Sequence, residues 1–301
     1  MGRDLKSFLK GKSVNGWSLF RWLAVFISVV MLVGMAGADL SSGPGVSTLI
    51  QLSARLAVPF VYLAFVASSL HVVLSSDGSA WLLRNRKYFG LGFGVAMAWQ
   101  ALFILWMILL HTDYYVDEVY LLRDLIEGLV GYIFLILMVI TSFRPGRRRL
   151  SRKQWHRLHT TGIYFLWAYA FSVYWWAIFY SASPEPMDFV LYGLGFVVWA
   201  FRAAAWHKNR LKKAKKDPEW TGPNPGLRVL GWGVIGCGLV LAVSGSLWYG
   251  SAEPWVYGYG VTQFPELYVP YWPFEPFWSL GVIGLGTFLL GAGVRRSAPL
   301  G

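Results

Sequence analysis

Charged residues are scarce in this chain, and cysteine is almost absent. Asp, Glu, Lys and Arg together make up 14% of the 301 residues, whereas soluble domains carry about 25%. The single cysteine, Cys237, excludes a disulfide or a thiolate metal site within the chain. Because 56% of the residues are hydrophobic, the composition instead fits several membrane spans, each of about 20 apolar residues.

Long apolar runs that do not alternate with polar residues predict helices, and lipid allows only helices or closed barrels. We therefore predict an all-α polytopic membrane protein. Eight transmembrane helices are expected, over residues 18–37, 49–75, 88–111, 120–142, 157–181, 187–206, 227–249 and 276–294. The first run has basic residues before it and small residues at its end, as a signal peptide does. Its length favours a membrane helix.

The basic residues lie in every second connection between the apolar runs. Of the 27 Lys and Arg residues, 25 follow this pattern, and Arg55 and Arg123 are the exceptions. Basic residues collect on the cytoplasmic side of membrane proteins, so we predict a multi-pass protein of the bacterial inner membrane with both termini cytoplasmic. Topology and contact with anionic membrane lipid account for the net charge of +12. No folded basic domain for nucleic acid is present.

Composition changes after the sixth apolar run. Residues 207–226 are rich in Lys and then in Pro and Gly, which predicts a basic cytoplasmic linker. This linker divides a six-helix core, 1–206, from a two-helix appendage, 227–301. The appendage contains an aromatic periplasmic loop, 250–278, without Lys or Arg. We expect the loop either to lie on lipid headgroups or, with the small-residue helix 227–249, to contact other membrane subunits.

Two of the five histidines share a depth in the predicted membrane. His71 precedes the inner end of the second span and His159 follows the start of the fifth, so both lie about 5 Å below the cytoplasmic surface. Imidazoles from facing helices can take both axial positions of a haem iron, and the propionates would then point toward Arg84, Arg86 and Arg157. The other interpretation is a pair of interfacial histidines that bind carbonyls or headgroups.

Three segments resemble the ferric reductase-like transmembrane domain family, over about residues 15–205. They are ASSLH (67–71), WLLRNRKYFGL (81–91) and WHRLHTTGIY (155–164), the last with a Trp-x-x-Leu-His element. That family includes the haem-binding membrane subunit of the periplasmic methionine-sulfoxide reductase system. The resemblance implies a haem b protein that moves electrons through the membrane, with His159 matching the family's histidine in the fifth span.

The chain departs from this family in its third span. The family leads us to expect a histidine in the middle of that span, where the chain instead has Met97, a weak ligand, and Gln100, a poor one. A second, outer haem would need ligands near Val58 and Ser172, and neither residue can bind iron. We therefore predict one haem b, and the alternative is a scaffold that has lost its haem sites.

Three charged residues lie near the predicted outer surface. Arg123 and Glu127 are four residues apart on one helix face, which favours an interfacial ion pair. The alternative is that Glu127 serves a proton-handling or quinone-headgroup site, with Arg55 as its partner.

No nucleotide-binding domain is predicted, since the cytoplasmic segments are short and no GxGxxG follows a strand. The leading hypothesis is a haem-b electron-transfer subunit of an oxidoreductase, without catalytic residues of its own. It would pass electrons from a separate cytoplasmic flavoprotein or a quinol toward the periplasmic side, with a quinone as a second candidate cofactor. The alternative hypothesis is a cofactor-free accessory or assembly subunit of a larger membrane complex.

Overall fold

A computed structural model describes residues 7–179, 184–217, 220–244, 247 and 277–295, and nearly all of them are helical. Six of its helices are long and apolar enough to cross a membrane, by length and composition. They are α2 (Gly16–Gly37), α3 (Gly43–Val73), α4 (Asp77–Leu110), α6 (Leu122–Thr141), α9 (Pro186–Ala214) and α10 (Pro225–Val243).

Two further helices complete the set that was predicted from apolar runs. The helix α8 (Arg152–Phe179) has 28 residues, but its many Trp and Tyr residues and its basic start lower its hydropathy. The helix α12 (Phe277–Leu290) has 14 residues and is therefore about 21 Å long, shorter than a hydrocarbon core of about 30 Å. Each of the eight predicted intervals overlaps one helix. The last helix ends four residues before the predicted end of its span, because the chain turns at Gly291.

The remaining elements are short. They are η1 (Lys12–Val14), α5 (Thr112–Tyr114), η2 (Tyr115–Val119), α7 (Arg144–Arg147), β1 (Trp220–Pro223) and β2 (Gly293–Arg295). The two strands pair in an antiparallel arrangement. The predicted linker 207–226 thus contains the last turns of α9, the strand β1 and the start of α10.

Short polar side chains set the helix starts. Ser42 Oγ accepts a hydrogen bond from the Gly45 amide at the start of α3. Ser76 and Ser79 cap the start of α4 reciprocally, each accepting the amide hydrogen of the other. The Asn224 side chain accepts two amides at the start of α10. These caps satisfy amide groups that have no partner within the helix, and so they fix where each apolar run becomes helical.

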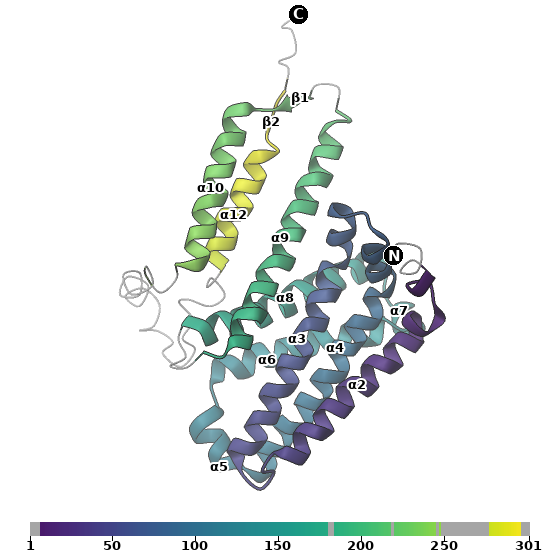
Figure 1. The fold of residues 1–301 in the computed structure, drawn as a ribbon, viewed down its shortest axis with the longest axis vertical. Coiled ribbons are helices and arrows are strands. Elements are labelled where there is room, and N and C mark those ends of the chain that lie inside the picture. The colour runs from purple at the N-terminus through teal and green to yellow at the C-terminus, as the bar shows by residue number, and fades with distance from the viewer. Residues whose placement is uncertain (1–6, 180–183, 218–219, 245–246, 248–276, 296–301) are drawn as a thin grey trace, which may run out of the picture.

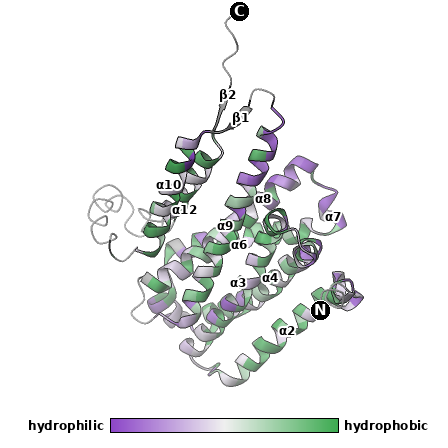
Figure 2. Ribbon diagram, turned by 45° about the horizontal axis from the view of Figure 1, so that its top comes forward, coloured by the Kyte–Doolittle hydropathy of each residue, from purple (hydrophilic) through white to green (hydrophobic). Residues whose placement is uncertain are grey.

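The helix α3 lies at the centre of the bundle. It packs against α2, α4, α8 and α9, while α6 packs mainly on α8. Figure 1 shows α10 and α12 side by side next to α9. Tyr192 on α9 donates a hydrogen bond to the carbonyl of Ala242 (3.0 Å), and Arg210 donates to that of Phe288 (2.8 Å). Hydrophilic residues gather on α7 and at the end of α9 nearest β1 (Figure 2).

A column of aromatic rings joins α8 to α3 and α9. Phe65 stacks on Trp167 with ring centroids 5.1 Å apart, Trp167 on Phe171 at 5.4 Å, and Phe171 on Tyr192 at 4.9 Å. Trp167 Nε1 also donates a hydrogen bond to the Gly195 carbonyl. The aromatic face of α8 is therefore buried inside the bundle, which explains why a core helix has a low hydropathy.

Glycines bring α10 and α12 into backbone contact. A Cβ atom on Gly231 would lie 2.9 Å from the Gly286 carbonyl oxygen, and one on Gly238 would lie 3.0 Å from that of Ser279. These small residues of α10 are thus used within the chain, whereas Gly233 has open space around it. The predicted aromatic loop 250–278 lies outside the described residues, apart from its last two positions.

The contact of Gly195 with the aromatic column gives a test of this packing. A Cβ atom there would lie 2.6 Å from Tyr62 Oη and 2.7 Å from the Phe171 ring. We expect Gly195→Ala to destabilise the purified protein by about 1–3 kcal/mol, measured as a lower unfolding midpoint in detergent. Gly193→Ala is the matched control, because nothing lies within 4 Å of its Cβ position. Equal midpoints for the two variants would contradict the packing.

Candidate functional site

His71 lies near the end of α3 and contacts the first turn of α4. Its Nδ1 atom is 3.0 Å from Ser79 Oγ. The Ser79 hydroxyl also lies 2.6 Å from the Leu74 carbonyl oxygen, to which it donates its single hydrogen. Ser79 Oγ must then accept from His71 Nδ1–H, so this network assigns the proton to Nδ1. His71 Nε2 is left unprotonated, which is the form of imidazole that binds a metal.

His159 repeats this arrangement near the start of α8. Its Nε2 atom is 2.9 Å from Thr141 Oγ1, at the end of α6. The Thr141 hydroxyl donates to the Leu137 carbonyl at 2.6 Å, so His159 Nε2–H donates to Thr141 and Nδ1 is left unprotonated. The ring also stacks on Trp155, with centroids 4.2 Å apart. Both half-buried histidines are therefore oriented by a hydroxyl and keep one basic nitrogen.

The two histidines contact different helix pairs. His71 bridges α3 and α4, and His159 bridges α6 and α8. In the part of the chain that the structure describes, no hydrogen bond or ring contact joins the two imidazoles. The sequence prediction that they share one iron stays a prediction.

Of the three arginines predicted to meet haem propionates, one points into the protein. Arg84 and Arg157 are exposed, whereas Arg86 is half-buried on α4. Arg202 on α9 is close enough to Arg86 for their positive charges to repel.

Arg202 is a candidate site residue that the sequence analysis missed. Its guanidinium carbon lies 4.4 Å from the ring centroid of Phe65 and 5.0 Å from that of Tyr164. Nη1 makes a long hydrogen bond of 3.4 Å to Ser68 Oγ, and the buried Nε has no hydrogen-bond partner. The only sequence signal was its apolar surroundings, since Phe201 precedes it and Ala203 follows it.

A separate cavity of about 610 Å³ lies between α3, α4, α6 and α8. It extends from η2 to the middle of the helices, and Met97 and Gln100 form part of its wall. Gln100 Oε1 accepts a hydrogen bond from Tyr132 Oη at 3.1 Å. The position where the resemblance led us to expect a histidine therefore faces a cavity whose described lining contains no imidazole. These residues do not fit an imidazole-ligated haem.

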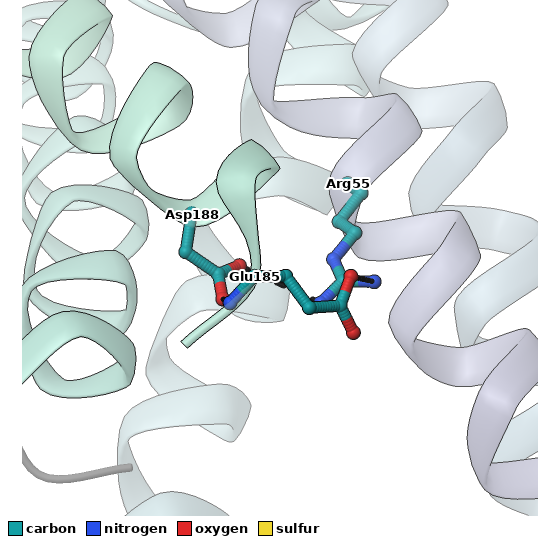
Figure 3. A network of polar contacts seen from close by, with 3 residues as sticks. All are labelled: Arg55, Glu185 and Asp188. Atoms are coloured by element: carbon teal, nitrogen blue, oxygen red, sulfur yellow. Dashed lines mark hydrogen bonds and ion pairs between the residues drawn. The ribbon is translucent and has the colours of Figure 1, made fainter. Parts of the chain in front are cut away.

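Arg55, which lies near the predicted outer surface, is paired with acidic side chains. Arg55 on α3 forms ion pairs with Glu185 (2.8 Å) and Asp188 (3.5 Å) at the start of α9 (Figure 3). The Asp188 carboxylate also accepts the Glu185 amide hydrogen and so caps α9. Arg55 therefore has two acidic partners at the start of α9, whereas the sequence analysis had offered it as a possible partner of Glu127.

The fold is that of a multi-pass helical membrane protein. Its sequence is similar to that of the protein-methionine-sulfoxide reductase haem-binding subunit MsrQ of Cronobacter sakazakii. The two are 26% identical over 212 residues, which cover 68% of this chain and 97% of the relative. This similarity confirms the predicted relationship to haem-binding membrane subunits. No family model matches the chain, and no solved structure matches it.

The ion pairs at the start of α9 allow the effect of burial on stability to be compared with the effect of distance. The Glu185 side chain is closer to Arg55 but 56% exposed, whereas that of Asp188 is 7% exposed. We expect Asp188→Asn to lower the free energy of unfolding by about 1.5–3 kcal/mol, as for other hydrogen bonds to charged groups. Solvent screening limits the loss in Glu185→Gln to below about 1 kcal/mol. Unfolding of both variants in detergent measures the two losses, and a larger loss in Glu185→Gln would show that distance to Arg55, rather than burial, determines the contribution.

Proposed function

We propose that this chain is a haem-binding electron-transfer subunit of a membrane oxidoreductase. The observation that carries the proposal is the matched contact of His71 and His159, each with one ring nitrogen within 3.0 Å of a hydroxyl oxygen that itself donates to a backbone carbonyl. A hydrogen-bond acceptor that fixes the tautomer and orientation of a histidine is typical of metal ligands. The similarity to a haem-binding subunit supports the same conclusion.

In this proposal His71 and His159 are the axial ligands of one haem b. Ser79 and Thr141 orient the two rings through the hydrogen bonds described above. Arg86 would neutralise a propionate in the half-buried layer, and the exposed Arg84 and Arg157 would do so at the surface. A bound haem supplies a one-electron carrier whose potential depends on its axial ligands and surroundings.

The electron donor is proposed to be a cytoplasmic flavoprotein or a quinol, with transfer toward the periplasmic side. The cavity between α3, α4, α6 and α8 supports a quinone as the second cofactor, between the haem and the periplasmic side. Its lining includes Leu105 and Leu129, which are 54% and 55% exposed on the apolar outside of the bundle. A molecule dissolved in lipid can enter there, and the Tyr132–Gln100 pair provides polar atoms for a ring oxygen.

We further propose that the six long apolar helices, together with α8 and the shorter α12, cross the bacterial inner membrane, with both termini cytoplasmic. The first six form a ferric reductase-like core, and α10 and α12 form an appendage. Val229 and Trp232 on α10 are 75% and 61% exposed, so this helix has apolar surface for lipid or for another membrane subunit. Residues 250–278 are proposed to contribute to the same contact.

Haem binding can be tested directly with single histidine variants. Purified after expression with ample haem, the chain should give a reduced-minus-oxidised spectrum of the b type. We expect His71→Ala and His159→Ala each to abolish it, because an axial ligand is removed. His156→Ala should keep it, since His156 is exposed and lies on the same helix as His159.

The hydroxyl partners provide a graded version of this test. Ser79→Ala and Thr141→Val should weaken haem binding by about tenfold or more, as loss of a ligand's hydrogen-bond partner does in metal sites. A colourless wild-type protein would refute the haem proposal. It would favour the alternative, a cofactor-free accessory subunit that keeps the scaffold.

Reporter fusions test the proposed topology. Alkaline phosphatase, which is active only in the periplasm, should be inactive when fused at residue 215, after α9, and active when fused at residue 117, within η2. The basic residues of the first position and the acids of the second set this expectation. Activity at residue 215 would reverse the orientation.

A further inference from the structure

Two guanidinium groups in the bundle have positive charge and no negative partner. Arg86 from α4 and Arg202 from α9 are both half-buried, and their charges repel each other. Neither arginine forms an ion pair with a carboxylate anywhere in residues 7–179, 184–217, 220–244 and 277–295. His159 lies in the same positive environment, since Arg86 and Arg147 both act on it.

The contacts of Arg202 leave part of its hydrogen-bonding capacity unused. One face of the guanidinium lies over the rings of Phe65 and Tyr164. Cation–π contacts of this kind hold the group in place but take up none of its N–H hydrogens. Of its nitrogens, Nη1 has the long bond to Ser68 Oγ, and Nε is buried with no partner. An arginine that ring contacts hold in place, and that keeps N–H groups without acceptors, is able to bind an anion.

Arg55 is a useful comparison from the same chain, because it is an arginine with a structural role. It receives two carboxylates, of which Asp188 is nearly fully buried. Burying a charge without a counter-charge is costly, and more so near lipid. Among the described residues no carboxylate pairs with Arg86 or Arg202, so an anionic group of a bound molecule would supply a counter-charge.

We propose that Arg86 and Arg202 form a binding site for one oxyanion, a carboxylate or phosphate, carried by an amphiphilic molecule whose apolar body lies in the bundle or the bilayer. Guanidinium groups bind both anions through paired N–H donors. Two molecules supply this chemistry: a haem through a propionate, and a phospholipid through its headgroup phosphate. The first source rests on the proposed function, and the second does not.

Each source has its own measurement. For the haem source, apoprotein is titrated with haem b and with its dimethyl ester, in which both propionates are uncharged. For the lipid source, native mass spectrometry counts bound phosphatidylglycerol, and diacylglycerol, which lacks the phosphate, is the control. The variants are Arg202→Gln and Arg86→Gln, with Arg202→Lys keeping the charge but losing the planar fork. Arg152→Gln is the matched control, because Arg152 is exposed at the start of α8 and is not assigned to the haem site.

In one of the two arms, wild type should prefer the anionic ligand over its uncharged counterpart by about tenfold, as expected for a hydrogen-bonded charge pair. Arg202→Gln and Arg86→Gln should remove that preference, Arg202→Lys should reduce it, and Arg152→Gln should keep it. Absence of any preference in wild type, in both arms, would overturn the proposal without a variant. So would a preference that Arg202→Gln retains, or that Arg152→Gln loses equally.

Failure of the haem proposal can be told apart from failure of this one. A chain that binds no haem refutes the proposed function, and the lipid arm then decides alone whether the arginine pair binds an oxyanion. A chain that binds haem and its dimethyl ester equally, and phosphatidylglycerol no better than diacylglycerol, keeps the proposed function and refutes the anion site. Size-exclusion profiles identify any variant that misfolds, and Arg202→Lys or Arg86→Gln then replaces it.

Discussion

A charge inside a helical bundle in lipid has no water to solvate it, so it must find a partner in the protein or in a bound molecule. The two ends of this bundle meet that constraint differently. Near the start of α9, Arg55 is neutralised by Glu185 and Asp188, so that end is complete within the chain. At the other end, Arg86 and Arg202 have no such partner among the described residues. The charge at one end of the bundle is thus neutralised within the chain, and the arginines at the other end are proposed to bind an anionic ligand.

Helix α8 contributes to several parts of the bundle, because different residues along its length contact different neighbours. Its first turns carry His159, held by Thr141 of α6. Tyr164 follows and lies beneath the Arg202 guanidinium. Trp167 then continues the aromatic column, and Tyr174 lines the cavity. A shift of α8 would therefore disturb the histidine, the arginine and the cavity together, and the aromatic column resists that shift by packing α8 against α3 and α9.

The sequence predicted the helix positions well, because bilayer thickness imposes the length of an apolar run and short capping residues mark its ends. It also predicted the relationship to haem-binding subunits, which rests on local motifs such as the one ending at His159. It did not predict the role proposed for Arg202, since a basic residue near the end of a predicted span is explained equally well by topology. The acids that bind Arg55 lie too far along the chain for a helical-spacing rule, and the cavity depends on how four helices pack.

The missing histidine of the third span limits what a haem in this chain can do. An iron near His71 and His159 would lie toward one surface, and most of a hydrocarbon core of about 30 Å would remain uncrossed. The cavity occupies part of that remaining depth, and Gln100, bonded to Tyr132, lines it where the family pattern has a ligand. The described lining there contains no imidazole, and the quinone proposed as a second cofactor would bind in this cavity. A single fixed haem and an apolar cavity that opens toward lipid are therefore complementary parts of one proposal.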